Sequence, residues 1–320
     1  MRGGQGEGDN VNLFNLFAII ASKDMNLSII IVAWNSEEYI RNCLDSILIS
    51  AGNLSLEIIV VDNGSSDETA KIVEQFYPQV SLIQNKTNLG YAKANNQGIE
   101  EARGEYILLL NPDTQVSEEA LSLMYEFMQE NPKVGALGPK LLNPDKTVQS
   151  SCREFPTFST LIWEFSGLSR LFPKSNVFGR WRMGNFDFDK TREVDQPMGS
   201  CLMLRRETLE DMGIFDENFG MFFNDVDLCF RIKKSGWKIY FYPEAKVIHH
   251  KGASTKKAKA KMIWLSHLAF YKFFKKHKTG LANRLLLFLL LIPLIFSAWI
   301  RILFFHLGRL TGVAKLVSRI

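Results

Sequence analysis

Carboxylates follow two of the apolar runs in this sequence. Asp62 comes directly after the run 56–61 within VVDNGSSD, and Asp113 follows the run 105–110 within LLLNPD. A carboxylate at the first position can accept a hydrogen bond from the N–H of a nucleotide base. One at the second can bind a hard divalent cation that also touches a diphosphate. Each residue alone also fits an ordinary turn, so it is the pair that favours a binding site.

Two further groups of ionisable residues lie later in the chain. Asp225 and Asp227 stand two residues apart in FFNDVDLCFR, just before a helical run, and His249 and His250 end the segment VIHH. The two acids also fit a structural role, in which one caps the helix and the other pairs with Arg231 at i+4. A histidine pair at a strand end, beyond several acids, can supply a metal ligand.

These residues need a sheet to bring them together. Apolar runs typical of buried strands occupy 27–34, 56–61, 80–83 and 105–110, and helical patterns occupy 37–50, 67–77, 92–102 and 117–130. Later ordered segments are 201–206, 237–242 and 245–250. Repeated β–α units predict a mostly parallel sheet with helices on both faces. Ligands of such sheets bind beyond the carboxyl ends of the strands, and we expect the runs before Asp62 and Asp113 to be adjacent.

The charge of the chain is unevenly distributed. The 320 residues are 46% apolar and 22% charged, which is typical of a globular protein and excludes a disordered one. The net charge of +4 hides an acid-free tail, because all 34 acidic residues precede Lys246 while fifteen of the 38 basic residues lie from Lys246 onward. Such a tail is expected to meet a polyanion, either nucleic acid or an anionic membrane. The four cysteines form no C-x-x-C pair and fit reduced thiols in the cytosol.

The end of the chain favours a membrane over nucleic acid. Residues 285–300 carry no charge, and basic residues flank them on both sides. Sixteen uncharged residues fall short of the roughly 20 that span a bilayer, and the positive-inside rule would hold both ends on the cytoplasmic face. The pattern predicts a re-entrant or in-plane anchor on that face of the cell membrane. The other reading is a buried C-terminal helix.

Three regions follow from these patterns. Residues 1–25 form a Gly-rich and partly apolar leader whose role the sequence does not reveal. The strand and helix alternation predicts one domain at 26–255, in which the aromatic and Arg-rich stretch 150–195 breaks the rhythm as an insertion. Residues 256–320 are expected to form basic, membrane-associating helices.

Seven ordered blocks carry a family resemblance. SIIIVAWNS, VVDNGSSD, NLGYAKANNQG, YILLLNPD, MGSCLMLRR, GIFDENFGMFFNDVDLCFRIKKSGW and IHHKGAS occur in this order between residues 26 and 255. The chain thus resembles the inverting glycosyltransferase family 2, and its rhamnosyltransferase-like branch in particular. The resemblance implies the GT-A fold, a Rossmann-like mostly parallel sheet with helices on both faces, here followed by the hydrophobic and basic C-terminal helices.

The resemblance also implies roles for particular residues. Ala33, Trp34 and Asp62 would line the pocket for the nucleotide base, with Asp62 bonded to a pyrimidine N–H. Asn111 and Asp113 stand where the family has its D-x-D-type motif.

By the same resemblance, Asp113 is the expected ligand of Mg²⁺ or Mn²⁺, and His249 the later one. Asp225 matches the general base, while 150–195 and 198–201 would shape the acceptor site.

Two positions depart from the family pattern. Asn111 replaces the first acid of D-x-D, and Asn224 stands where an acid often precedes the base. Asn111 lowers the negative charge around the expected metal, and Asn224 removes one acid beside the proposed base, but the base itself, Asp225, remains.

The expected reaction is a single displacement. Asp225 would take a proton from an acceptor hydroxyl as its oxygen attacks the anomeric carbon, and the centre would invert. The expected partners are a dTDP- or UDP-sugar donor, carrying rhamnose or a hexose, a saccharide or lipid-linked acceptor, and the membrane surface. The setting is the synthesis of cell-surface polysaccharide.

Other functions explain the sequence less well. A nucleotidyltransferase would carry a Gly-rich phosphate loop after the first strand, where this chain has AWNSEEY. A non-catalytic nucleotide-sugar-binding or membrane-scaffold protein remains the alternative, because Asn111 and Asn224 replace acids. Nucleic-acid binding is not expected, since the uncharged core of the tail suits lipid better than a phosphate backbone.

Overall fold

The computed structural model describes residues 25–250 and 259–310. Most of the leader predicted at 1–25, the last residues of the domain predicted at 26–255 and the final part of the tail lie outside these ranges.

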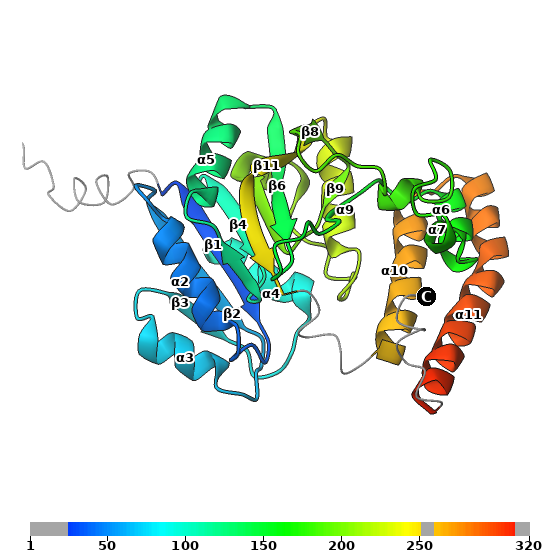
Figure 1. Cartoon of the computed structure of the whole chain (residues 1–320), viewed down its shortest axis with the longest axis horizontal. Helices are drawn as coiled ribbons and strands as arrows, with labels where there is room; N and C mark the ends of the chain where they lie inside the picture. The colour runs from blue at the N-terminus through cyan, green and yellow to red at the C-terminus, as the bar shows by residue number, and fades with distance from the viewer. Residues whose placement is uncertain (1–24, 251–258, 311–320) are drawn as a thin grey trace, which may run out of the picture.

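A nine-stranded sheet forms the centre of the molecule, in the order β3-β2-β1-β4-β10-β6-β11-β5, with β8 paired to β11 (Figure 1). Pairing is parallel from β3 to β4 and between β6 and β11, while β10, β5 and β8 run antiparallel to their neighbours. The strands are β1 (Leu27–Ala33), β2 (Leu56–Asp62), β3 (Ser81–Gln84), β4 (Tyr106–Leu110), β5 (Thr114–Val116), β6 (Val134–Leu142), β8 (Arg192–Glu193), β10 (Cys201–Arg205) and β11 (Lys238–His249). The mostly parallel sheet expected from the β–α units is confirmed.

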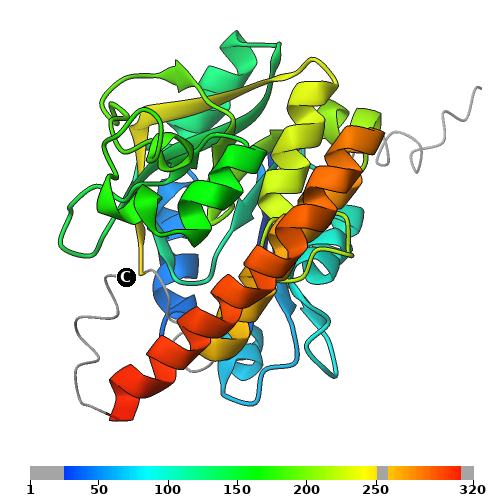
Figure 2. The ribbon, with the colours of Figure 1, turned by 90° about the vertical axis from the view of Figure 1, so that its right-hand side faces the viewer.

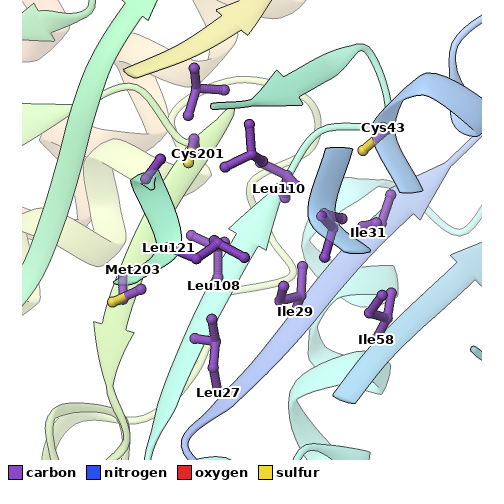
Figure 3. Packing of buried hydrophobic residues seen from close by; sticks show 14 of the residues in the cluster. Leu27, Ile29, Ile31, Cys43, Ile58, Leu108, Leu110, Leu121, Cys201 and Met203 are labelled. Atoms are coloured by element: carbon purple, nitrogen blue, oxygen red, sulfur yellow. The ribbon is translucent and has the colours of Figure 1, made fainter. Parts of the chain in front are cut away.

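Helices cover both faces of the sheet. One face packs against α2 (Ile40–Ser50), α3 (Thr69–Phe76) and α5 (Ala120–Glu130). The other packs against α4 (Tyr91–Glu101), α8 (Arg206–Met212) and α9 (Asn224–Lys234). The central strands supply both cores by alternation: Ile29 and Ile31 of β1 point to the first face and Ile30 to the second. Figure 3 shows the first of these cores. Burial on both faces explains why these strands are continuous apolar runs.

The strand order differs from the expectation in one respect. We expected β2 and β4 to be adjacent, but β1 lies between them and pairs with both. The prediction of adjacency was wrong because sequence order does not reveal that the first strand takes a central place. Asp62 and Asp113 still lie beyond the same edge of the sheet, since all three strands are parallel.

The stretch 150–195 has more structure than its weak periodicity suggested. It holds α6 (Phe158–Phe165), α7 (Leu168–Leu171), the short 3-10 helix η1 (Arg180–Arg182) and the strand β7 (Cys152–Arg153). β7 pairs with β9 (Gln196–Pro197) in a separate two-stranded sheet.

The insertion packs against the C-terminal helices rather than against the main sheet alone. α10 (Lys259–His277) and α11 (Leu281–Leu310) contact each other, and a third apolar core joins them to α6 and to the start of α9. Leu161, Phe223 and Phe273 are three of its buried members. Figure 1 shows α6, α7, α10 and α11 as a group beside the sheet, and Figure 2 shows α11 crossing that side of the molecule.

α11 has one buried and one exposed face. Its segment Leu281–Leu303 has 23 residues and a mean hydropathy of 2.5, and 22% of the most apolar part is buried. By length and composition this is the one helix of the described residues that could cross a membrane. Its inward side packs through Leu287, Leu294 and Ala298, while Phe288 and Ile292 are among its exposed residues.

Candidate active site

The carboxyl ends of the parallel strands place the predicted site residues at one edge of the sheet. β2 ends at Asp62, β4 ends just before Asn111, and β11 ends at His249. The segment before β10 reaches the same edge from the other direction, and Asn111 N donates to Ser200 O at 2.9 Å. Topology therefore gathers residues that are almost 190 positions apart in the chain.

Asp62 is a buried carboxylate with one oxygen unused. The residue is 4% exposed, and its Oδ2 accepts a hydrogen bond from Ser65 N at 3.3 Å. Oδ1 is buried and has no hydrogen-bond partner among the described residues. Leaving a buried acceptor unpaired costs about 1–3 kcal/mol, which a ligand N–H at this position would recover.

The neighbours of Asp62 fix the surrounding loops. Asn63 Oδ1 accepts from Leu89 N at 2.9 Å, and Asn63 Nδ2 donates to Asn88 Oδ1 at 3.1 Å. Gly64 has φ +75°, and a Cβ there would lie 2.7 Å from the Thr87 backbone. Only glycine allows this approach.

Ala33 and Trp34 lie beside this pocket at the end of β1. Ala33 is fully buried in the first core, and its carbonyl accepts from Asn63 N at 2.8 Å. Ala33 therefore contributes to the site through its main chain rather than its side chain. Trp34 is 37% exposed and can offer its ring to a ligand.

Asp113 and His249 form a pair. His249 Nε2 lies 3.4 Å from Asp113 Oδ1, and both side chains are nearly buried. The backbone reinforces the pair, because His250 N donates to Asp113 O at 2.8 Å.

Gln149 orients the His249 ring. Its Oε1 lies 3.1 Å from His249 Nδ1, and its Nε2 donates to His249 O at 2.6 Å. This arrangement favours the proton on Nδ1 and turns the lone pair of Nε2 toward Asp113, as an outer partner does for a metal-binding histidine. Sequence reasoning missed Gln149, since a lone glutamine in a polar stretch carries no signal.

These two side chains fit a divalent cation. Two ligand atoms bound at about 2.1 Å and at right angles lie about 3 Å apart, close to the observed separation. Within residues 25–250 and 259–310 no group of three or more His, Cys, Asp or Glu side chains could hold a metal. Asp113 and His249 would then be the two side-chain ligands from this part of the chain, which suits an ion that completes its shell with phosphate oxygens and water.

Asn111 contributes chiefly through its backbone. Besides its bond to Ser200, its carbonyl accepts from Thr114 Oγ1 at 2.7 Å. It thereby closes the turn that carries Asp113.

Asp225 lies in the first turn of α9 and is held by three donors. Gln196 Nε2 and Gly199 N donate to Oδ2 at 2.9 and 3.1 Å, and Val226 N donates to Oδ1 at 2.9 Å. Burial raises the pKa of Asp225 above its usual range, although these hydrogen bonds oppose the shift. A carboxylate whose proton affinity is raised in this way is better suited to accept a proton than an ordinary aspartate.

Gln196, Gly199 and Tyr91 complete the surroundings of Asp225, and sequence reasoning assigned none of them a role individually. A Cβ at Gly199 would lie 3.0 Å from the Cβ of Asp225, so this glycine permits the close contact. Tyr91 OH donates to Gly199 O at 3.1 Å. Burial raises the pKa of Tyr91, and the charges of Asp225 and Asp113 raise it further, which places the tyrosine near both carboxylates.

The two neighbours of Asp225 in the motif have structural roles. Asp227 is fully buried and accepts from Arg231 Nε at 2.9 Å, as the i+4 pairing predicted. Asn224 Nδ2 donates to Gly220 O at 3.0 Å, a bond that a glutamate could not make. This contact gives a physical reason for the amide where the family often has an acid.

Comparisons with known proteins agree with this architecture. The model of glycosyl transferase family 2 matches residues 28–213. N-acetylglucosaminyl-diphospho-decaprenol L-rhamnosyltransferase of Mycobacterium tuberculosis is 29% identical over 265 residues, which are 79% of this chain and 85% of the relative. The low-salt glycan biosynthesis hexosyltransferase Agl10 of Haloferax volcanii is 28% identical over 218 residues, 67% of this chain and 64% of the relative.

Solved structures share the fold at low sequence identity. S. aureus TarS 1–349 superposes with a TM-score of 0.51 and 19% identity, covering 87% of this chain and 82% of that one. The chain spans 39% of the longer TarS structure. GalNAc-T7 with UDP, GalNAc and Mn²⁺ gives a TM-score of 0.51 at 13% identity, covering 71% of this chain and 44% of that one. The matched family model, which covers more than half of the chain, and the sheet with its strand-end site agree: this chain belongs to glycosyltransferase family 2 and is a glycosyltransferase with the GT-A fold.

Proposed function

We propose that this glycosyltransferase moves a sugar from a dTDP- or UDP-sugar to a hydroxyl of a saccharide or lipid-linked acceptor, with inversion at the anomeric carbon. The observation that carries the proposal is the convergence of an unpaired Asp62 oxygen, the Asp113–His249 pair and the half-buried Asp225 around one sheet edge. The named activities of the rhamnosyltransferase and hexosyltransferase relatives support rhamnose or a hexose as the transferred group, in the synthesis of cell-surface polysaccharide.

Asp62 and the end of β1 serve the donor. The free Oδ1 of Asp62 accepts the imino N–H of a uracil or thymine base, and Trp34 lies against the nucleoside. Asp113 and His249 would hold a Mg²⁺ or Mn²⁺, which would neutralise charge on the diphosphate leaving group. GalNAc-T7 with UDP and Mn²⁺ supports this cofactor, since it shares the fold.

Asp225 serves the acceptor. Its Oδ2 already accepts two hydrogen bonds and its Oδ1 only one, so Oδ1 keeps a free position for a proton. The acceptor hydroxyl transfers its proton to Oδ1 while its oxygen bonds to the anomeric carbon, and the bond to the leaving diphosphate breaks on the opposite side. One displacement of this kind inverts the centre.

The product's stereochemistry tests this function. Purified protein is incubated with Mn²⁺, a panel of dTDP- and UDP-sugars and a saccharide acceptor, and the product is examined by proton NMR. We expect at least one donor to give a glycoside of inverted anomeric configuration. A product with retained configuration would contradict the single displacement, and donors that bind without any transfer would favour the non-catalytic alternative.

We further propose that α11 lies in the plane of the cytoplasmic leaflet. The helix is packed along α10 and α6 through its inward side, and these contacts with the rest of the molecule support an in-plane orientation. Its outward apolar side and the basic residues at 272–284 are suited to an anionic membrane. The domain at 26–255 would then work at the membrane surface.

A further inference from the structure

Three arginines lie where the stretch 150–195 packs against α11. Arg153 on β7, Arg182 on η1 and Arg301 on α11 are each half-buried. Glu164 on α6, which is 5% exposed, forms an ion pair with Arg182, and its charge also acts on Arg153 and Arg301. Three cations near Glu164, with only Arg153 also influenced by Asp225, leave an excess of positive charge, and burying uncompensated charge is costly.

Only one of the three arginines is hydrogen-bonded to Glu164. Arg182 forms a two-pronged pair with it, with Nε and Nη2 donating at 2.7 and 2.6 Å. Glu164 also favours the charged form of Arg301, which makes no hydrogen bond within the described residues.

Arg153 has no carboxylate partner within the described part of the chain. Its Nη1 donates to the carbonyls of Ser150 and Cys152 at 3.2 and 2.6 Å, and its Nε and Nη2 make no hydrogen bond there. Burial and the nearby Arg182 lower its pKa, while the charges of Glu164 and Asp225 oppose that shift. The guanidinium thus keeps free donors in a half-buried position.

The strand pairing orients Arg153 toward the catalytic edge. Arg153 lies directly opposite Gln196 in the β7–β9 pair, and residues opposite each other in an antiparallel pair point to the same face. Gln196 donates to Asp225 Oδ2, so Arg153 and Asp225 flank the same glutamine. The arginine group therefore adjoins the acceptor side of the site.

A second unpaired donor lies in the group. Trp181 has the guanidiniums of Arg153 and Arg182 at 6.0 and 5.8 Å from its ring centre. Its indole N–H is buried and finds no acceptor among the described residues. Free guanidinium donors beside an unpaired N–H are the complement of a ligand rich in anionic oxygens.

We propose that Arg153, Arg182 and Arg301 bind the diphosphate of a lipid-linked acceptor. This inference rests on the proposed function and specifies its acceptor as a lipid diphosphate. In such an acceptor the diphosphate joins the lipid to the sugar. The lipid would lie toward the exposed side of α11 and the sugar toward Asp225. The arginines occupy the corresponding place between the membrane-facing helices and the base.

Binding of a short lipid diphosphate tests the site apart from catalysis. Full-length protein in detergent is titrated with geranyl diphosphate and with geraniol, in EDTA so that a metal at Asp113 and His249 contributes nothing. We expect the wild type to prefer the diphosphate, Arg153→Gln to bind it at least about tenfold more weakly, and Arg153→Lys to retain part of the affinity. Arg180→Gln is the matched control, because Arg180 lies on the same segment with its side chain 71% exposed.

Two further binding measurements test whether the arginines bind the phosphates of the donor or of a lipid headgroup instead. Binding of UDP with Mn²⁺ and sedimentation with phosphatidylglycerol vesicles should be unchanged in Arg153→Gln. An equal loss in either would overturn the proposal, since the arginines would then serve the donor or a lipid headgroup. Unchanged binding of geranyl diphosphate by Arg153→Gln, or a wild type that does not distinguish it from geraniol, would also overturn it.

Transfer assays then distinguish this inference from the proposed function. Arg153→Gln should raise KM for a lipid-diphosphate-linked saccharide at least about tenfold and leave KM for the same saccharide without phosphate unchanged. A rise for both acceptors would contradict a phosphate-specific role. A protein that binds geranyl diphosphate through Arg153 but transfers no sugar would refute the proposed function and retain the anion site.

Discussion

At the scale of single residues, the candidate site depends on carboxylates whose burial gives them different properties. Asp62 has an unused oxygen, Asp113 faces a histidine, and Asp225 is half-buried with a raised pKa. The three carboxylates lie near one sheet edge, yet each has surroundings suited to a different task. The proposed roles of base-binding acceptor, metal ligand and proton acceptor thus follow from environment rather than from residue type.

Replacing Asp225 by asparagine tests the proton acceptor. The variant keeps the shape of the side chain but has no carboxylate to take a proton. We expect kcat to fall by about 10²–10⁴ with the donor dissociation constant nearly unchanged. A variant with more than about a tenth of the wild-type kcat, when chemistry limits the rate, would exclude Asp225 as the base.

The pH profile of the wild type provides an independent check on the same residue. A base must be deprotonated to act, and burial raises the pKa of Asp225. The acid limb of kcat/KM should therefore lie above the ordinary range of an aspartate.

Replacing Asp62 by asparagine should weaken nucleotide binding without lowering the stability of the free protein. The amide is neutral and offers the base an N–H as well as an oxygen, so UDP or dTDP should bind about tenfold more weakly. The melting temperature of the free protein should stay the same or rise, because a buried unpaired charge is removed. Isothermal titration and thermal unfolding measure the two effects, and a loss of stability without a loss of nucleotide binding would contradict the assignment.

At the scale of elements, α9 links the proposed base, Asp225, to the C-terminal helices. Asp227 Oδ1 accepts from His277 Nε2 at 2.7 Å and lies 2.8 Å from Lys276 Nζ, while Oδ2 accepts from Arg231. Although burial alone would raise it, these partners lower the pKa of Asp227 to about 2. The residue thus joins α10 to the helix that carries Asp225.

This pairing predicts an acid sensitivity that Asp227 confers on the fold. A depressed native pKa contributes stability that is present above the unfolded pKa of about 4 and is lost as pH falls toward about 2. Asp227→Asn should be less stable than the wild type at pH 7, and the difference should shrink between about pH 4 and pH 2. Equal unfolding curves at all pH values would show that the network adds no stability.

The sequence predicted the strands that are buried on both faces better than those that carry glycine or proline. β1, β2 and β4 are apolar runs, and their ends were placed within one or two residues. β6 was missed because Gly135, Gly138 and Pro139 resemble a loop. A Cβ at Gly138 would lie 2.4 Å from the Pro197 side chain, so the fold requires glycine at this position. The same glycine makes the strand hard to recognise in the sequence.

Features that depend on residues far apart in the chain were also not predicted from the sequence. The segments 237–242 and 245–250 were expected separately but form one strand, β11, with a shift in register between Tyr242 and Lys246. Asp113 and His249 were predicted individually as ligands, and the structure places their side chains together. Gln149 was not predicted, because its role depends on a strand a hundred residues away.

At the scale of the whole molecule, the exposed side of α11 provides the proposed contact with the membrane. Phe288, Ile292 and Trp299 are 70%, 76% and 64% exposed, whereas Leu294 on the same helix is 6% exposed. An apolar helix face of this kind is costly in water and favourable at a lipid surface.

Substituting that outward side should release the protein without unfolding it. The triple variant Phe288→Ser, Ile292→Ser and Trp299→Ser should move from the membrane fraction to the soluble fraction with a melting temperature close to that of the wild type. Leu294→Ser is the contrasting control, expected to lower stability while leaving membrane binding largely intact. A triple variant that remains in the membrane fraction would contradict docking through this face.

Metal dependence tests the central claim most directly. Asp113 and His249 are proposed to place a divalent cation beside the donor diphosphate, at the same edge as Asp62 and Asp225. Sugar transfer by the full-length enzyme should vanish after exhaustive treatment with EDTA and return on addition of Mn²⁺ or Mg²⁺, whereas Asp113→Ala should stay inactive and folded in either case. Transfer at the wild-type rate after complete removal of the metal would contradict the account.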